Sequence, residues 1–443
     1  FKPLHAGHLY TTLVGDVISR LVENAGAETV RINYGGDVGL HVAKSMWAIM
    51  QYVGGEYPEK ITEIAEADRA TWLGDRYVEG NNAYSESEMA KSEIIAINKR
   101  VYSLHTEQDK ESGFAQIYWL CRGYSYEFFK KLYADLHVKP FDRYIAESEV
   151  TPLGITTVNK QLEKGVFERS NGAVIFDGEK HGLHARVFIN SEGLPTYEAK
   201  DVGLSLTKWA DYKFDESIII TASEQEQYMQ VVLKAIEQFA PDPSQRTKHL
   251  THGLVKLQGG AKMSSREGNI VSAFEILEAA KQAGKESETA TSEAIVLAAV
   301  KYAFFKARIG GDIAYDPAES IAMEGNSGPY LQYAHARARS ILSKSVSKAH
   351  KFSENIKLEQ YERSLARKLS EYSEVIANAT NELAPHVVCS YLYELAQNFN
   401  RFYENSKVIG DDREELRIKL VFEYAETLKT GLALLGIEAT DSM

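Results

Sequence analysis

The pattern of apolar and polar residues predicts an α/β region at the start of the chain. Near the N-terminus, apolar residues recur three and four positions apart, which predicts a helix that Gly26 is placed to end. The segment ETVRIN (28–33) then predicts a short strand, and YGGDVG (34–39) predicts a glycine-rich loop at its carboxyl end. A histidine loop, a helix and a strand in this order are typical of a βαβ unit with a parallel sheet. The apolar stripe of the helix comprises Leu13, Val14, Val17, Ile18, Leu21 and Val22.

A second α/β stretch follows further along the chain. Residues 216–239 predict a strand, a turn and an amphipathic helix, and Ser223 and Glu226 have the spacing of a capping box. Residues 250–260 predict one more strand and a turn. Between the two halves, residues 56–112 and 154–194 are interpreted as insertions into one sheet domain, the first partly helical and the second hairpin-like.

The pattern becomes helix-periodic from about residue 290 onward, which predicts an all-α bundle. The expected fold is therefore an α/β Rossmann-type catalytic domain over residues 1–289, with a parallel sheet and insertions, followed by a helical-bundle domain over residues 290–443.

Composition narrows the class of protein. The chain has 62 acidic and 50 basic side chains and a formal charge of −12, which argues against general coating of nucleic acid but allows a local basic face. No run of apolar residues reaches the length of a membrane span, so no membrane association is expected. The two cysteines, Cys121 and Cys389, are far apart in sequence, which disfavours a cysteine zinc site and fits a reducing cytoplasm.

The segment HAGH (5–8) stands at the predicted start of the first helix. A helix N-terminus carries unpaired N–H groups and partial positive charge, and histidine side chains add donors, so this segment is a candidate phosphate cradle. Gly7 would let a ligand approach the backbone closely. The alternative is a pair of loop histidines, one of which caps the helix.

The segment GGAKMSSREGN (259–269) places Lys262, two hydroxyls, Arg266 and three glycines in a short loop. Such a loop suits transient contact with a pyrophosphate, although it lacks the spacing of a Walker loop. Taken alone, the segment is better explained as a solvated basic turn.

The two segments in this order resemble the paired signatures of class I aminoacyl-tRNA synthetases, and the whole chain resembles the arginyl-tRNA synthetase family. The segments that carry this resemblance are KPLHAGHL, NYGGDVG, FDRYIAESEV, LPTYEAKDVGL, KMSSREGN, GPYLQYAHARARSIL and LYELAQNFNRFYENSKVI. The resemblance implies an ATP-dependent arginine–tRNA ligase, with Mg²⁺·ATP, L-arginine and tRNA(Arg) as substrates and no tightly bound cofactor. It implies that His5, His8, Lys262 and Lys2 are catalytic, and that Gly7, Met263, Ser264 and Ser265 join His5, His8 and Lys262 in binding ATP.

An arginine pocket can be argued partly from the residues themselves. A guanidinium is a planar fork of donors that never loses its charge, so its pocket needs fixed carboxylates. Tyr197 and Asp201 are four apart on a helix that Pro195 is placed to open, so both can face one cavity. The resemblance implies that Glu147, Tyr197 and Asp201 contact the guanidinium and that Gln225 contacts the main-chain part of arginine. Without the resemblance, a solvated Tyr/Asp face is the simpler interpretation.

The chain departs from the family pattern in several places. Ser265 stands where the general signature has a second lysine, and the resemblance implies that Lys2 compensates. Val38 stands where a tryptophan is common. A short Ser-Pro-Asn-like segment and an N-terminal domain are expected upstream of Phe1, and the TDSM ending is expected to be a genuine C-terminus.

In the helical region, a basic segment with nearby aromatic residues suits contact with anticodon bases, although a helix face over core aromatics is the better explanation for any one of these residues. The residues concerned are Arg337, Arg339, Lys344, Lys348 and Lys351, with Tyr330, Tyr333, Phe399, Phe402 and Tyr403.

HGLH (181–184) is interpreted as a turn into a strand, and no metal site is expected. Two other functions stay open: a non-catalytic paralogue that binds arginine or tRNA, and a sister ligase for cysteine or glutamine. The sequence leaves the oligomeric state open, with a monomer as the expectation.

Overall fold

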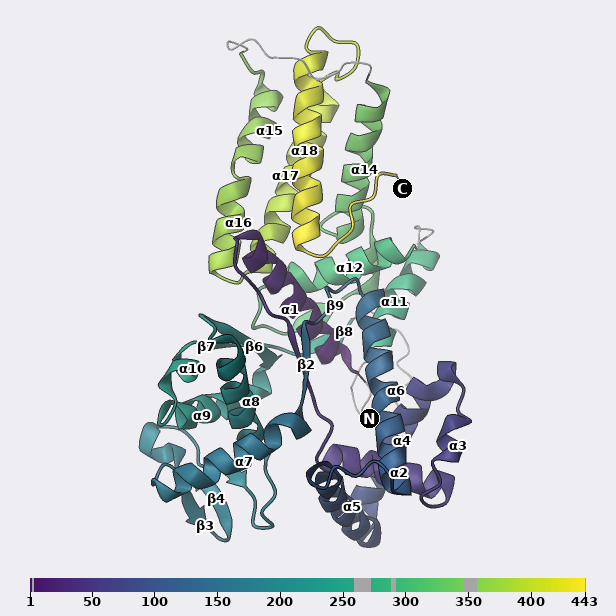
Figure 1. Ribbon diagram of the computed structural model, residues 1–443. Coiled ribbons are helices and arrows are strands. Elements are labelled where there is room, and N and C mark those ends of the chain that lie inside the picture. Colours follow the sequence, from purple (N-terminus) through teal and green to yellow (C-terminus); the bar gives the residue numbers. More distant parts are fainter. Residues whose placement is uncertain (2–3, 259–271, 288–291, 346–356, 443) are drawn as a thin grey trace. The chain divides into compact units, whose positions relative to one another are not determined.

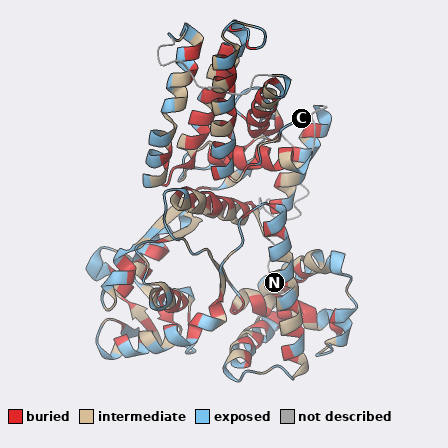
Figure 2. Cartoon of the chain, turned by 45° about the horizontal axis from the view of Figure 1, so that its top comes forward, coloured by how far each residue is buried: buried red, intermediate tan, exposed pale blue. Residues whose placement is uncertain are grey.

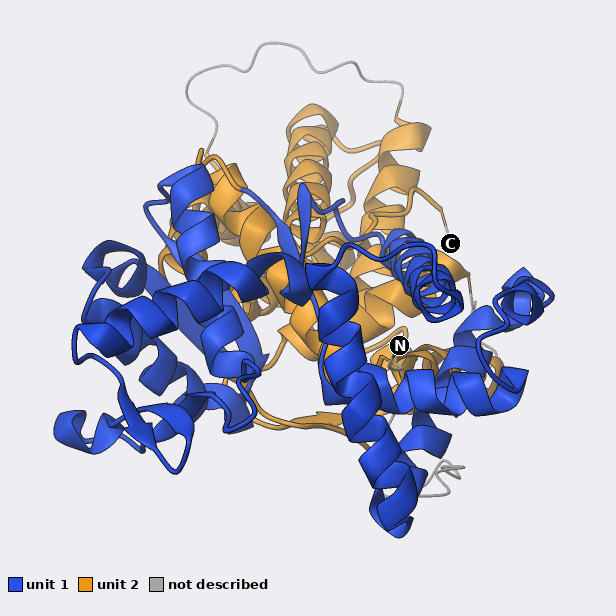
Figure 3. Cartoon of the chain, turned by 60° about the horizontal axis from the view of Figure 1, so that its bottom comes forward, with its two compact units in different colours: residues 1–3, 30–251 blue, residues 4–29, 252–443 orange. Residues whose placement is uncertain are grey.

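The structure is a computed structural model that describes residues 1, 4–258, 272–287, 292–345 and 357–442. The chain divides into two compact units (Figure 3). One comprises residues 1–3 and 30–251, and the other comprises residues 4–29 and 252–443. The domain boundary expected between residues 289 and 290 stays a prediction.

The first unit is organised around two parallel strands, β1 (Ile32–Gly35) and β2 (Arg143–Ala146), paired from Ile32↔Arg143 to Gly35↔Ala146. Strand β1 begins four residues later than ETVRIN predicts. Just before the strand, the Arg31 N–H donates to Asp142 Oδ2 at 2.6 Å, whereas the Arg31 carbonyl accepts from the Asp142 backbone N–H at 2.9 Å. The predicted glycine-rich loop does follow the strand.

The remaining elements of this unit are helical except for one antiparallel sheet, β3-β4-β5, and the hydrogen-bonded pair β6–β7 (Figure 1). The strands are β3 (Glu168–Ser170), β4 (Ala173–Phe176), β5 (Arg186–Ile189), β6 (Ser217–Ala222) and β7 (Thr247–His252). The helices are α2 (Leu40–Val53), α3 (Glu59–Thr62), α4 (Arg69–Glu86), α5 (Glu88–Thr106), α6 (Gly113–Asp135), α7 (Glu147–Glu163), α8 (Tyr197–Tyr212), α9 (Glu226–Glu237) and α10 (Pro241–Gln245), with short 3₁₀ turns η1 (Glu66–Asp68), η2 (Gly178–His181) and η3 (Ser223–Gln225).

Two apolar cores hold these elements together. Fully buried side chains such as Val42, Met46 and Ile94 pack α2, α5 and α6 together. Phe167, Phe188 and other side chains pack α7, α8 and α9 against the β3-β4-β5 sheet. Burying apolar surface of this kind stabilises a fold by roughly 25 cal/mol per Å².

The capping box expected at Ser223 and Glu226 is wrong. Ser223 lies in the 3₁₀ turn η3, and the residue that precedes α9 is Gln225, whose side chain makes no capping hydrogen bond. In its place, the Glu226 N–H at the helix start donates to the Ser223 carbonyl of the 3₁₀ turn.

The second unit contains helix α1 (Ala6–Asn24) and the helical region. Its strands β8 (Val255–Leu257) and β9 (Ile313–Tyr315) pair in parallel, and β9 is a short exception in a region expected to be helical throughout. Gly26 has φ of 92° just past the end of α1, as expected of a residue that ends a helix. The other helices are α11 (Ala273–Glu286), α12 (Glu293–Phe305), α13 (Pro317–Ile321), α14 (Gly328–Lys344), α15 (Gln360–Ser370), α16 (Tyr372–Asn381), α17 (Pro385–Asn405) and α18 (Glu414–Leu434).

Buried residues line the inner faces of these helices, as Figure 2 shows. Phe399 on α17 stacks on Tyr424 of α18 with ring centroids 3.9 Å apart. Among the described helices, none has both the length and the apolar character that crossing a bilayer requires.

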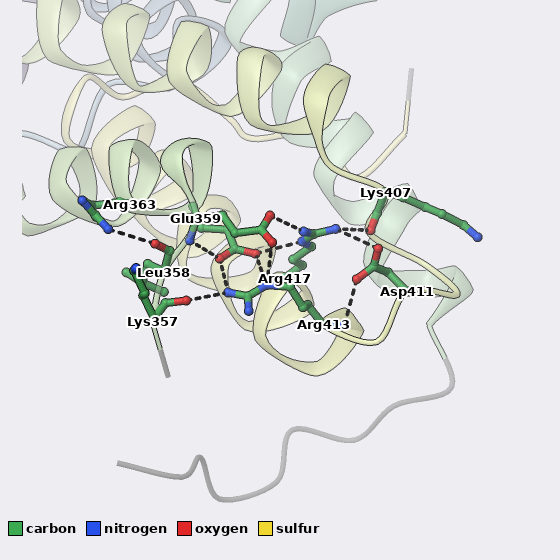
Figure 4. A network of polar contacts seen from close by, with 9 residues as sticks. Lys357, Leu358, Glu359, Arg363, Lys407, Asp411, Arg413 and Arg417 are labelled. Carbon is green, nitrogen blue, oxygen red and sulfur yellow. Dashed lines mark hydrogen bonds and ion pairs between the residues drawn. The ribbon is translucent and has the colours of Figure 1, made fainter. Parts of the chain in front are cut away.

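A buried carboxylate joins α15 to α18 (Figure 4). The Glu362 side chain is 0% exposed and accepts from Arg413 Nε at 2.8 Å and Arg417 Nε at 2.9 Å. Glu359 accepts from Arg417 at 2.8 Å, and Asp411 pairs with the same guanidinium. Burial alone would raise the pKa of Glu362, but hydrogen bonds from Arg413, the Glu359 N–H and Arg417 lower it to about 2.

We expect this network to give the helical region an acid-sensitive stability. Because the folded pKa of Glu362 lies below its unfolded value, its contribution is present above about pH 4.5 and is lost as the pH falls toward 2. The shift corresponds to about 3 kcal/mol. Glu362→Gln should lower the free energy of unfolding at pH 7 and flatten its dependence on pH in this window, as measured by urea unfolding followed by circular dichroism. Exposed Glu382→Gln serves as the control, and equal pH profiles for Glu362→Gln and the wild type would refute the assignment.

Candidate active site

The two histidines of HAGH cap the N-terminus of α1, and their rings contact each other. His5 is the N-cap residue, and its Nδ1 accepts from the Gly7 N–H at 3.1 Å. The His5 N–H donates to Nδ1 of His8 at 3.2 Å, and the ring centroids are 3.7 Å apart. The arrangement is a capping box built from histidines, so the helix-capping alternative is present in the structure and involves both rings.

This capping also fixes where each ring holds its proton. A nitrogen that accepts a hydrogen bond carries no proton, so a neutral His5 or His8 carries its proton on Nε2. Each ring is thereby defined as an Nε2–H donor. Gly7 has a structural explanation too, because a Cβ at this position would lie 2.9 Å from the His5 ring.

Several predicted site residues lie outside the described residues. They are Lys2, Lys262, Met263, Ser264, Ser265 and Arg266 of the predicted nucleotide site, and Lys348 and Lys351 of the predicted anticodon surface. Their roles stay as predictions.

The predicted arginine-contacting residues lie in the other unit, where β1 and β2 end. Glu147 is the first residue of α7 and follows β2 directly. Asp37, in the loop after β1, accepts from the Ser148 N–H at 2.9 Å and from the Ser148 hydroxyl at 2.7 Å, while Arg122 donates to it at 3.0 Å. Asp37 therefore caps α7 from a separate loop and fixes the point from which the Glu147 side chain starts.

Backbone contact between α7 and α8 sets the spacing of the site. A Cβ added to Gly154 would lie 2.1 Å from the Ala199 carbonyl oxygen, and one added to Gly203 would lie 2.2 Å from that of Val150. Only glycine fits at either place, so main chain packs directly against main chain where the two helices meet. Glu147 on α7 is thereby held beside the first turns of α8.

Glu147 forms a buried ion pair with Lys200. Lys200 Nζ lies 2.5 Å from Glu147 Oε2, and the two side chains are 3% and 7% exposed. Burial raises the pKa of Glu147 to about 7, and Lys200 opposes this rise, while Asp201 and Asp37 add to it.

Asp201 lies one residue further along α8. It accepts a hydrogen bond from the Tyr228 hydroxyl of α9. Burial raises the pKa of Asp201 to about 6, and the Tyr228 hydrogen bond opposes the rise. Asp201 also lines a pocket whose other walls are mainly apolar side chains of α8, β6 and α9.

The other two predicted contacts flank this pair of carboxylates. The Tyr197 side chain opens α8 and is 54% exposed, with its ring centroid 4.4 Å from Lys200 Nζ. Besides burial, Asp201 raises the pKa of Glu147, and Glu147 raises that of Tyr197, so these three side chains lie close together. Gln225 stands just before α9, the helix whose Tyr228 bonds Asp201.

Lys200 and Tyr34 are functional candidates that the sequence reasoning missed. The buried Tyr34 hydroxyl, just after the start of β1, finds no hydrogen-bond partner in the described part of the chain. Burial raises its pKa well above the ordinary value, and the charges of Asp201 and Glu147 raise it further. For Lys200 a signal was available, since Tyr197, Lys200 and Asp201 are spaced i, i+3, i+4 and share one helix face.

The remaining candidate residues divide into those buried in the apolar core and those exposed on the surface. Phe399 and Phe402 are 0% exposed and belong to the core, so they are not available to nucleic-acid bases. Tyr333 is 40% exposed, and Arg337 lies over its ring at 4.9 Å. His181 lies in the turn η2 and stacks on Phe176, as the turn interpretation of HGLH expects.

Comparison with known families completes this picture. Residues 1–309 match the family described as tRNA synthetases class I (R), catalytic domain, and residues 331–443 match the DALR anticodon binding domain. The fold and the match define a class I aminoacyl-tRNA synthetase. Within that class, the chain belongs to the arginyl-tRNA synthetase family, which confirms the resemblance found in the sequence.

Individual relatives agree with this assignment. The arginine–tRNA ligase of Borreliella burgdorferi is 32% identical over 98% of this chain and 77% of its own length. That of Bacteroides fragilis is 29% identical over 100% of this chain and 79% of its own length. The solved arginyl-tRNA synthetase of Thermus thermophilus superposes with a TM-score of 0.77 at 26% identity, covering 100% of this chain and 80% of its own.

Proposed function

We propose that this chain activates L-arginine with Mg²⁺·ATP and transfers it to the terminal ribose of tRNA(Arg). The observation that carries the proposal is the pair of carboxylates, the buried Glu147 and the half-buried Asp201, on two helices that meet at glycine contacts. Family membership indicates the class of reaction, and the two carboxylates explain why the substrate is arginine.

The carboxylates suit a guanidinium better than an ammonium. The N–H donors of a guanidinium lie in its plane and point outward along different edges, so two separated carboxylates can each accept from it. A lysine ammonium reaching the same place leaves one buried carboxylate short of hydrogen bonds, at a cost of ~1.5–3 kcal/mol per bond. Tyr197 flanks the guanidinium, and Gln225 holds the main-chain part of the substrate.

In the first chemical step, the arginine carboxylate attacks the α-phosphate and pyrophosphate leaves. The Nε2–H donors of His5 and His8 hydrogen-bond phosphate oxygens as negative charge moves toward the leaving group. Gly7 lies in this cradle, Lys2 and Lys262 neutralise the charge, and Met263, Ser264 and Ser265 hold the nucleotide. In the second step a ribose hydroxyl of the tRNA attacks the adenylate, and AMP leaves. Alignment of the reactants contributes ~7–11 kcal/mol in reactions of this kind.

The helical region is the proposed tRNA-reading part. Tyr333 and Tyr403 are exposed aromatics on α14 and α17, and Arg337 is held by Tyr333 and by Asn400 Oδ1 at 3.2 Å. Exposed aromatic faces beside a guanidinium suit stacking of unpaired bases. Both cysteines are free and buried, which supports a reducing compartment, and we propose the cytoplasm.

The test is charging of total tRNA with each labelled amino acid in the presence of Mg²⁺·ATP. Arginine alone should appear on tRNA. A different single amino acid would overturn the assignment of Glu147, Tyr197 and Asp201. Binding of arginine or tRNA without release of pyrophosphate would instead support the non-catalytic paralogue.

A further inference from the structure

The Lys200–Glu147 pair is unusual because it is buried and lies between the residues proposed to bind substrate. Both side chains are under 10% exposed, and their charged atoms are 2.5 Å apart. Removing two charges from water costs several kcal/mol per ion, so such a pair is weak evidence for added stability. Its position suggests a role in the site.

The loop after β1 lies beside the pair. A Cβ on Gly39 would lie 3.6 Å from Lys200 Nζ, and one on Gly36 would lie 3.4 Å from Glu147 Oε1. A side chain at either glycine would therefore reach one member of the pair. Oε2 of Glu147 is taken by Lys200, so Oε1 is the oxygen left to the substrate.

We propose that Lys200 is a positioning residue for arginine recognition, whose ammonium keeps Glu147 charged and orients it toward the guanidinium. This inference rests on the proposed function of Glu147. Lys200 itself does not touch the reacting atoms. It acts through the carboxylate, which must be an anion to accept two charge-assisted hydrogen bonds.

The surroundings of Glu147 explain why a positively charged side chain of the protein is needed to keep its carboxylate ionised. Burial and the neighbouring acids raise the pKa of Glu147 to about 7, and Lys200 opposes them. Removing the cation should therefore raise this pKa further and leave the carboxyl neutral at pH 7. The charged and titratable groups around it are Tyr34 (β1), Asp37 with Arg122 (loop and α6), His41 (α2), Tyr102 (α5), and Tyr197, Lys200 and Asp201 (α8).

The experiment compares Lys200→Gln and Lys200→Arg with the wild type. Arginine KM in tRNA charging, and arginine binding by calorimetry, are measured from about pH 6 to about pH 9. In the wild type, affinity should rise with pH as Glu147 ionises. In Lys200→Gln the midpoint should move up by at least about one pH unit, so that arginine KM at pH 7 rises about fivefold or more, with ATP KM unchanged. Lys200→Arg keeps the charge and should restore the wild-type midpoint.

Controls separate the possible outcomes. Lys234→Gln removes a lysine from α9 that pairs with Glu237 away from the site, and it should behave as the wild type. If Lys200→Gln does not fold, Lys200→Met keeps the apolar stem and replaces it in the same titration. An unshifted midpoint, or an equal loss of affinity at every pH without rescue by arginine, would overturn the role of Lys200. A wild type that charges no arginine would overturn the proposed function instead.

Discussion

Replacing Asp201 by asparagine is expected to raise the KM for arginine by about 10²- to 10³-fold and to remove most of the preference for arginine over citrulline, its neutral isostere. Truncating one partner of a buried charged pair costs about 2–5 kcal/mol, a span that brackets this range. Asparagine preserves the shape of the side chain and can still accept from Tyr228. The effect should therefore report the lost charge rather than a changed pocket.

The measurement is the ratio of kcat/KM for the two amino acids in tRNA charging. Asp215→Asn removes the same charge at a fully exposed position and should leave the ratio unchanged. An Asp201→Asn enzyme with the wild-type arginine KM would show that this carboxylate does not contact the substrate.

Replacing His8 by glutamine is expected to lower kcat for charging by about 10²-fold or more, because it removes a transition-state donor. Glutamine at the third position of a helix can reach back to the N-cap backbone N–H, so the capping contact of His8 is retained. His8→Ala should lose both, with a similar fall in kcat and an additional loss of about 1 kcal/mol of stability.

The comparison of the two variants separates chemistry from folding. Thermal unfolding should be near wild type for His8→Gln and lowered for His8→Ala, while pre-steady-state kinetics should show the adenylation step slowed in both. If His8→Gln loses less than threefold in kcat, the histidine is only a helix cap.

The sequence predicted the elements with strong periodicity best. Helix α1, strand β6 and the helical region follow from their apolar patterns, and burial of Leu13, Val17 and Leu21 confirms the stripe on α1. The capping box at Ser223 failed because spacing alone cannot distinguish a cap from a 3₁₀ turn. Just before β1, the Arg31 N–H bonds to a carboxylate 111 residues away, a contact that local patterns do not contain.

The sequence predicted the residues of the site better than it predicted the contacts that bring them together. Glu147, Tyr197 and Asp201 came from family resemblance, and their convergence depends on contacts that no motif encodes. Asp37 bonding Ser148 and Tyr228 bonding Asp201 both join segments far apart in sequence. Lys200 was overlooked because a lysine beside an aspartate on a helix usually indicates a solvated face, whereas here it is 3% exposed.

The glycine contacts between α7 and α8 affect how the amino-acid preference of this pocket could be changed. The spacing of the helices depends on main chain packed against main chain at Gly154 and Gly203, not on the side chains that face the substrate. Exchanging those side chains changes the chemistry of the cavity while its frame stays in place. A library that varies Glu147, Tyr197, Lys200 and Asp201 and fixes both glycines is therefore the economical route to an altered amino-acid preference.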